Sequence, residues 1–137
     1  MRTFFDTNIL IYLFDEDSPK KKVLAQQLFE NETRAGRVVL STQVIQEFYV
    51  AATKKLADPL CPEDAETVVR NLTALPLIQI DATMILTAIG KSRVLGFSFW
   101  DSLIVTAAIA SGAECLFTED LQHGQIIDGL RIENPFR

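Results

Sequence analysis

The feature of this sequence that most constrains its fold is a regular alternation of short apolar runs with longer segments of helical periodicity. Apolar runs of strand length lie at residues 3–5, 38–40, 77–80, 115–117 and 130–132. Helical patterns separate the first four of these runs. Parallel strands need long crossover connections, usually helices, so the alternation predicts a parallel sheet with helices on both faces. The predicted fold class is α/β.

Residues typical of helix ends mark the borders of several predicted helices. Pro19 suits the first turn of the second helix, because proline lacks an N–H group that would be unpaired there. Either Ser41 or Thr42 is the expected cap of the third helix. Asp81 and Ser98 precede two further apolar helical patterns and are predicted to cap them.

Composition indicates one globular domain that spans residues 1–137. Apolar residues make up 48% of the chain and charged residues 23%, a balance that supports a packed core. No repeat, low-complexity tract or Gly/Ser-rich linker divides the chain. Cys61 and Cys115 belong to no C-x-x-C pair, so neither a zinc knuckle nor a disulfide framework is predicted.

The charge balance and the absence of a targeting pattern restrict the class of protein. Residues 9–14 are apolar, but Asp6 and Asn8 precede them and no small-residue cleavage site follows, so we predict no signal peptide and a cytoplasmic protein. No uncharged apolar stretch approaches the length of a membrane helix. The net charge of −5 argues against a general nucleic-acid coat protein, since basic side chains must neutralise phosphates there. It is compatible with an enzyme whose grouped carboxylates bind cations.

Two acidic residues follow predicted strands. Asp6 ends the first apolar run, and Asp120 lies just after the run at 115–117. In open parallel sheets, ligands bind outside the carboxyl ends of the strands. These two acids, from opposite ends of the sequence, are therefore expected to meet at one edge of the sheet.

Each acid also has a structural interpretation. Asp6 is a good N-cap for the first helix. Asp101 completes an S-x-x-D capping box that begins at Ser98. Either Glu119 or Asp120 fits a turn residue, so the two remain alternative candidates for the acid that faces inward.

Pattern alone gives two other polar residues a surface position. Glu47 lies on the opposite side of its predicted helix from the apolar stripe, which indicates a solvated glutamate. His123 lies in a polar turn with no acid, His or Cys at ligand spacing, and we interpret it as a surface histidine.

Four motifs together resemble the PIN-domain family, and in particular the VapC-type toxin ribonucleases. In order along the chain they read Phe5-Asp6-Thr7-Asn8-Ile9-Leu10, Gln46-Glu47-Phe48, Phe99-Trp100-Asp101-Ser102-Leu103-Ile104 and Leu116-Phe117-Thr118-Glu119-Asp120. Each motif is short, but their order and spacing are similar over nearly the whole chain. The sequence departs from the family pattern after Asp120, where members often carry a further acid and an aromatic residue and this chain reads Leu121-Gln122-His123-Gly124.

The resemblance implies a three-layer α/β/α fold and a metal-dependent endoribonuclease. It implies that the catalytic and metal-binding acids are Asp6, Glu47, Asp101 and Asp120, supported by the polar residues Asn8 and Thr118. It further implies the toxin of a toxin–antitoxin pair, inhibited by a small antitoxin protein and assembled as a homodimer. The alternative is a catalytically inactive module of the same fold that binds RNA or protein.

The residue types are consistent with hydrolysis at a metal site. Carboxylate oxygens without His or Cys suit Mg²⁺ or Mn²⁺. No Ser, Cys or His nucleophile is placed beside a base, so we expect in-line hydrolysis of RNA without a covalent enzyme intermediate. An aspartate-based phosphotransferase is disfavoured, because residues 8 and 10 are Asn and Leu rather than the Asp and Thr of the D-x-D-x-T pattern.

Basic residues that contact the RNA are the least specific prediction. Lys91 and Arg93, which precede the helix of Asp101, are the first candidates. The alternatives are the lysines at 20–22 and 54–55. A solvated basic face is the favoured interpretation of each of these groups.

Overall fold

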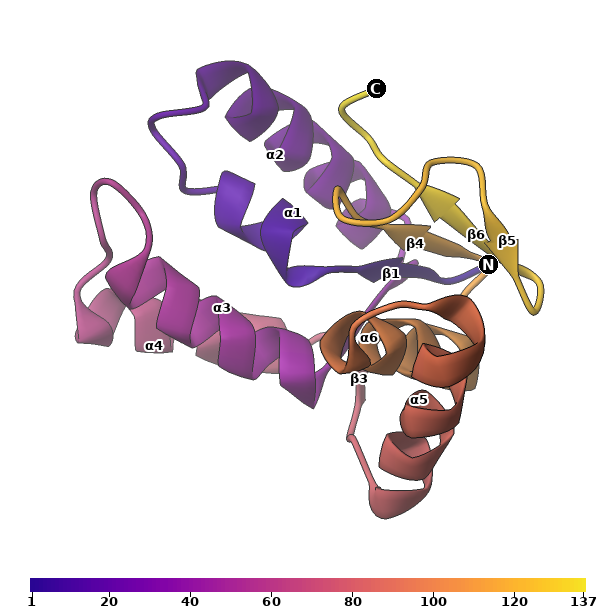
Figure 1. Ribbon diagram of the computed structural model, residues 1–137. Helices are drawn as coiled ribbons and strands as arrows, with labels where there is room; N and C mark the ends of the chain where they lie inside the picture. Colours follow the sequence, from indigo (N-terminus) through magenta and orange to yellow (C-terminus); the bar gives the residue numbers. More distant parts are fainter.

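A six-stranded sheet forms the centre of the computed structural model, which describes residues 1–137 (Figure 1). The strand order is β3-β2-β1-β4-β6-β5, and all neighbouring strands are parallel except β5 and β6. This arrangement confirms the predicted α/β class with a mostly parallel sheet. The strands are β1 (Thr3–Phe5), β2 (Val38–Ser41), β3 (Leu77–Ile78), β4 (Cys115–Phe117), β5 (Ile126–Ile127) and β6 (Leu130–Glu133).

Helices cover both faces of the sheet. In Figure 1, α2 lies on one side of β1, and α5 and α6 lie on the other. Phe5 of β1 meets Phe29 of α2 edge to face, with ring centroids 5.2 Å apart. The helices are α1 (Thr7–Tyr12), α2 (Pro19–Arg34), α3 (Thr42–Lys54), α4 (Pro62–Thr73), α5 (Ala82–Leu95) and α6 (Phe99–Ala110).

The central strands are short and buried along their whole length. Every residue of β1, β2 and β4 is buried, including side chains on both faces of the sheet. Phe4, Leu40 and Leu116 are fully inaccessible to solvent. Burial on both faces explains why these strands read as continuous apolar runs rather than as alternating patterns.

Side-chain caps fix the starts of α3, α5 and α6. The Ser41 hydroxyl accepts a hydrogen bond from the backbone N–H of Val44, which settles the choice between Ser41 and Thr42 for α3. Asp81 caps α5 in the same way. Ser98 caps α6 by accepting from the backbone N–H of Asp101 at 3.1 Å. Each cap satisfies an N–H group that the helix itself leaves without a partner.

The structure differs from the sequence predictions at two strands. The predicted strand at 77–80 is shorter, because β3 contains Leu77 and Ile78 only. The unpredicted strand β5 forms an antiparallel hairpin with β6. Asp128 and Gly129 connect them with positive φ angles of 49° and 85°, the conformation that the Asp-Gly pair favours in two-residue hairpin turns.

Several apolar side chains of α3 and α5 are exposed. Tyr49 of α3 is exposed, as are Ile85, Leu86 and Ile89 of α5. No single helix is both long and apolar enough to cross a membrane, and α5 and α6 reach that criterion only as a pair bent by 116°. Helix α6, in contrast, is buried over most of its length.

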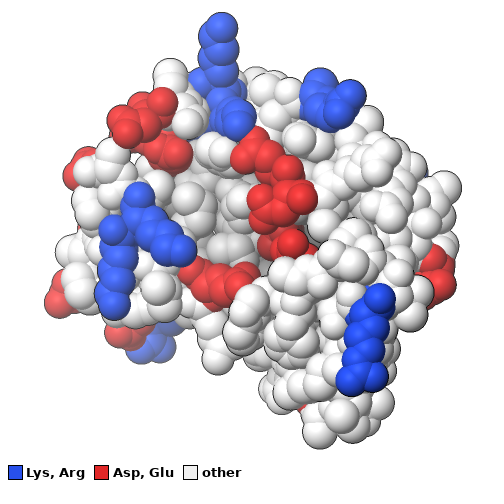
Figure 2. All heavy atoms as spheres, in the orientation of Figure 1, with Lys and Arg blue, Asp and Glu red and all other residues white.

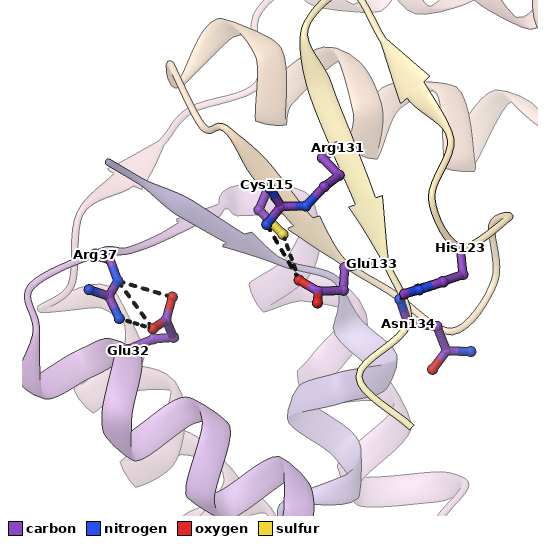
Figure 3. A network of polar contacts seen from close by, with 7 residues as sticks. All are labelled: Glu32, Arg37, Cys115, His123, Arg131, Glu133 and Asn134. Carbon is purple, nitrogen blue, oxygen red and sulfur yellow. Dashed lines mark hydrogen bonds and ion pairs between the residues drawn. The ribbon is translucent and has the colours of Figure 1, made fainter. Parts of the chain in front are cut away.

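Figure 3 shows polar contacts of Glu32 with Arg37, of Cys115 with Glu133, and of His123 with Asn134. Arg37 pairs with the buried Glu32 and holds the pKa of that carboxyl below its usual range. Cys115 lies beside Glu133, and burial raises the pKa of the thiol to about 12. Both the burial of Cys115 and its raised pKa favour the neutral thiol.

Candidate functional site

The four acids of the predicted quartet line one pocket at the carboxyl edge of the sheet. Asp6 follows β1, Asp120 lies in the loop after β4, and Asp101 lies in the first turn of α6. Glu47 reaches the same pocket from α3, which follows β2. The pocket has a volume of about 710 Å³. Figure 2 shows acidic side chains gathered around a hollow on this face, with the basic side chains placed toward its periphery.

Asp6 is both the cap of α1 and a member of the site. Its Oδ1 accepts a hydrogen bond from the backbone N–H of Thr7 at 2.7 Å. Its Oδ2 accepts a hydrogen bond from the Thr118 hydroxyl, also at 2.7 Å. The carboxyl is only 5% exposed. The capping and site interpretations therefore apply together, because the cap uses one oxygen and does not remove the charge from the pocket.

The surroundings of Asp6 disfavour its negative charge. Burial raises the pKa of Asp6 to about 7, and the nearby carboxylates of Asp120 and Glu47 add to this effect. The hydrogen bonds from Thr118 and Thr7 act in the opposite direction but do not compensate. Carboxyl groups with a raised pKa and no basic partner are common in sites that bind a cation or transfer a proton.

Asp101 lies in the first turn of α6, which is capped by Ser98. Its backbone N–H donates to Ser98, as the capping box predicts, while its side chain lines the pocket. Burial raises the pKa of Asp101, and the charges of Asp120 and Glu47 raise it further, whereas Ser98 lowers it. Asp6 and Asp101 are thus both affected by the charges of Asp120 and Glu47.

Glu47 faces the pocket and not bulk solvent, so the position inferred from helical periodicity is wrong. Its Oε1 accepts a hydrogen bond from the Thr7 hydroxyl at 2.7 Å. Gln43, one helical turn earlier and buried, donates to the other carboxylate oxygen at 3.4 Å. Periodicity failed here because α3 also packs against α1, so the side of α3 that faces away from the core borders the pocket at Gln43 and Glu47.

The structure separates Asp120 from its neighbour Glu119. Asp120 lines the pocket, and its backbone N–H donates to the Thr118 hydroxyl at 3.1 Å. Glu119 accepts hydrogen bonds from Tyr12 at 2.6 Å and from Lys21, with which it also forms an ion pair. These contacts hold the pKa of Glu119 below its usual range despite partial burial. The free acid in the pocket is therefore Asp120.

The contacts of Glu119 define a clasp made of Tyr12, Lys21 and Glu119, which the sequence did not indicate. Lys21 also donates to the Tyr12 hydroxyl at 3.3 Å and lies over the rings of Tyr12 and Phe136. The clasp joins α1, α2 and the loop of Asp120. Its members are separated by up to 107 positions in the sequence, so local patterns carry no signal for it.

Asn8, one of the predicted supporting polar residues, has a buried amide without a hydrogen-bond partner. Both the amide oxygen and the amide nitrogen of Asn8 are buried without a hydrogen-bond partner in the protein. Asn8 lines the pocket beside Asp6. Buried polar atoms without partners are rare in native proteins, so this amide indicates a place where a polar ligand completes the site.

The donor types of the pocket fit a hard divalent cation, although the side chains are not drawn together around one. No group of three acidic, His or Cys side chains is close enough to ligate a single ion as the side chains stand. The available ligand atoms are carboxylate oxygens of Asp6, Glu47, Asp101 and Asp120 together with the amide oxygen of Asn8. Magnesium and manganese prefer such oxygen ligands and commonly keep several waters, so a few carboxylates are sufficient for binding.

The predicted RNA-binding residues Lys91 and Arg93 do not line the pocket. Lys91 is paired with Asp128 in the turn between β5 and β6. Among the alternatives named from the sequence, Lys55 is the one that lines the pocket. His123 also lies outside it, where its Nδ1 accepts a hydrogen bond from the backbone N–H of Asn134 (Figure 3).

Comparisons with solved structures identify proteins of similar fold. A toxin–antitoxin complex from Klebsiella pneumoniae contains a chain with 21% identity and a TM-score of 0.70, with 97% of each chain covered. The DNA-bound VapBC complex of Salmonella typhimurium gives 23% identity and a TM-score of 0.67, with 98% of each chain covered. Mycobacterium tuberculosis VapC20, described as a toxin that cleaves the sarcin-ricin loop, gives 17% identity and a TM-score of 0.64, with 86% of this chain and 91% of that chain covered.

A comparison with sequence families gives the more direct assignment. No curated protein sequence matches the chain. The profile of the PIN domain family matches residues 3–127, a range that contains all four acids of the pocket. Because this match extends over far more than half of the sequence, the chain belongs to the PIN domain family.

Proposed function

We propose that this protein is a metal-dependent endoribonuclease that hydrolyses RNA phosphodiester bonds. The observation that carries the proposal is the convergence of four carboxylates from separate segments in one pocket, none of which forms an ion pair with a Lys or Arg. Lys55 is the only basic residue that lines the pocket. Uncompensated like charges destabilise a folded protein, and bound divalent cations are the usual compensation at a phosphodiester-cleaving site.

The residues of the pocket have distinct proposed roles. Asp6 and Asp101 hold Mg²⁺ or Mn²⁺ directly, and Glu47 and Asp120 complete the site directly or through water. Thr118, which contacts Asp6 and the backbone of Asp120, orients both acids. The cation, when bound, supplies an acidified water and stabilises charge on the phosphodiester. The Asn8 amide is free to bind a water or a phosphate oxygen.

The biological setting is the second part of the proposal. The similar structures are described as toxin–antitoxin assemblies, which supports a toxin inhibited by a small antitoxin protein. We extend this to a homodimer, for which the exposed apolar residues of α5 supply a surface. The alternative, an inactive PIN module that binds RNA or protein, would keep the fold without cleaving RNA.

The first prediction concerns activity. Purified protein should cleave total RNA internally in Mn²⁺ or Mg²⁺ and should lose this activity in EDTA. Asp101→Asn should reduce cleavage by at least about a hundredfold, because it removes a proposed ligand. Asp64→Asn, at an exposed position of α4, is the matched control and should keep full activity. Undiminished cleavage in EDTA would contradict the metal mechanism, and no cleavage under any condition would favour the inactive module.

The second prediction concerns Glu47. Glu47→Gln keeps an oxygen that can accept from Thr7 but removes the charge. The variant should unfold at the same temperature as wild type within about 2 °C, while its turnover falls by about 10- to 100-fold. Glu66→Gln on the surface of α4 serves as the control. Equal turnover of wild type and Glu47→Gln would show that Glu47 takes no part in the reaction.

The third prediction separates the two neighbouring acids. Asp120→Asn should weaken Mn²⁺ binding, measured by electron paramagnetic resonance, far more than Glu119→Gln does. The reason is that Asp120 faces the pocket, whereas Glu119 is neutralised by Lys21. A larger loss of Mn²⁺ affinity in Glu119→Gln would mean that the clasp opens in solution and that Glu119 is the ligand.

The fourth prediction follows from the raised pKa of Asp6. In EDTA, the folded protein binds the Asp6 proton more tightly than the unfolded chain does, because the pKa rises from 3.8 to about 7. The free energy of unfolding should therefore fall as the pH rises from about 4 to 7, and should level off above that range. Asp6→Asn should remove this pH dependence, since asparagine is neutral and caps a helix as well as aspartate does.

Thermal melts with and without metal test whether the charge of Asp6 destabilises the metal-free protein. At pH 8 in EDTA, Asp6→Asn should melt at or above the wild-type temperature, with about 4 °C gained per kcal/mol of relieved repulsion. Mn²⁺ should raise the wild-type melting temperature, since a hundredfold excess over Kd adds about 2.7 kcal/mol, and should raise that of the mutant much less. An Asp6→Asn protein that melts several degrees lower in EDTA, beside a wild type indifferent to Mn²⁺, would show that Asp6 acts only as a cap.

A further inference from the structure

An exposed tryptophan lies at the edge of the acidic pocket, where the fold itself does not require it. Trp100 is 60% exposed and lines the pocket directly beside Asp101. Among the large apolar side chains that are exposed, only Val50 shares this position in the pocket. Tryptophan is normally well buried, and an exposed indole at a binding cavity is a common feature of recognition sites.

The structure holds Trp100 in a defined position. Its indole ring meets the ring of Phe99 edge to face, with centroids 5.1 Å apart and an interplanar angle of 76°. Its backbone carbonyl accepts a hydrogen bond from Gln43 of α3 at 3.2 Å. Gln43 is buried and also donates to Glu47, so a single side chain links Trp100 to the acids. A rigid aromatic side chain loses little conformational entropy when it binds a ligand.

The charge of the pocket restricts what can lie against the indole. Asp101 follows Trp100 in the sequence. Gln43 donates hydrogen bonds both to the Trp100 carbonyl and to the Glu47 carboxylate, so Glu47 is also near. A phosphate group would be repelled here unless cations were bound, whereas a planar neutral ring system would not. If a cation bound by Asp101 holds the scissile phosphate, the adjoining nucleotide lies in the same pocket as Trp100, the neighbour of Asp101 in the sequence. A nucleobase therefore satisfies both the geometry and the charge.

We propose that Trp100 is a stacking platform for the nucleobase next to the cleaved phosphate. The inference rests on the proposed ribonuclease function and adds a base-binding subsite to it. Stacking on an aromatic side chain accepts any base face and is strongest for large rings, so this subsite favours a base over an abasic position rather than one base over all others. Sequence preference would then arise from hydrogen bonds to the edge of the stacked base.

The experiment uses the fact that Trp100 is the only tryptophan of the chain. Random-sequence RNA hexamers are added to Asp6→Asn protein in Mg²⁺, a background in which the RNA should stay intact, and the intrinsic fluorescence is followed. Stacking should quench the emission. A ribose-phosphate hexamer without bases has the same charge and should leave the emission unchanged at equal concentration.

Substitutions measure the contribution of the ring. With a fluorescein-labelled hexamer and anisotropy as the readout, Trp100→Ala should weaken binding by roughly 5- to 150-fold, the range that corresponds to about 1–3 kcal/mol per stacked base. Trp100→Phe should lose less, because it keeps an aromatic face. Tyr49→Ala removes an exposed aromatic side chain of α3 that does not line the pocket and should change nothing. Binding of the abasic hexamer should be equal in all four proteins.

The outcomes separate this inference from the proposed function. If wild-type protein cleaves RNA while Trp100→Ala binds hexamers as tightly as its parent, the nuclease stands and the stacking platform is wrong. If the hexamer quenches Trp100 but wild type cleaves no RNA, the base-binding subsite stands and the nuclease proposal fails. A Trp100→Ala protein that changes from dimer to monomer on size exclusion with unchanged RNA affinity would assign Trp100 to a contact between copies. Quenching by an arginine-rich hexapeptide but not by RNA would assign it to a protein partner.

Discussion

The hydrogen bond between Thr118 and Asp6 joins the two ends of the sequence at the point on which the candidate site depends. It forms because β1 and β4 are parallel neighbours, with Phe5 opposite Phe117, so that the residues after both strands leave the sheet side by side. The Thr118 hydroxyl donates to Asp6 and accepts from the backbone of Asp120. A single hydroxyl thereby fixes two acids whose charges repel, and the buried strands around it leave little freedom to relax.

This arrangement explains why the acids are combined with helix starts. Asp6 and Asp101 each lie in the first turn or at the cap of a helix, where the unpaired N–H groups and the helix dipole stabilise a negative charge. That stabilisation partly offsets the burial that raises the pKa of both carboxyls. The structural and functional interpretations of these residues are therefore not alternatives, because the cap makes the buried charge tolerable and leaves it facing the pocket.

Local patterns predicted the fold far better than they predicted the site. The strands and caps followed from short-range signals, such as the apolar run at 115–117 and the serine before α6. Glu47 could not be placed by periodicity, since its neighbours Thr7 and Gln43 belong to a helix contact that only tertiary packing creates. Resemblance to known motifs indicated Glu47 where the residue pattern did not. The β5–β6 hairpin was predictable in principle from its Asp-Gly turn.

Glu119 and Asp120 show how the fold assigns opposite electrostatic environments to adjacent residues. Both residues lie in a bend after β4, and only Asp120 lines the pocket. Lys21 neutralises Glu119 and Tyr12 donates a hydrogen bond to it, which keeps a fifth uncompensated charge away from the quartet. The same contacts anchor the loop from outside while Thr118 anchors it from inside. Asp120 is thus positioned by its neighbour as well as by its own bonds, which makes α2, a helix with no acid in the pocket, a structural part of the site.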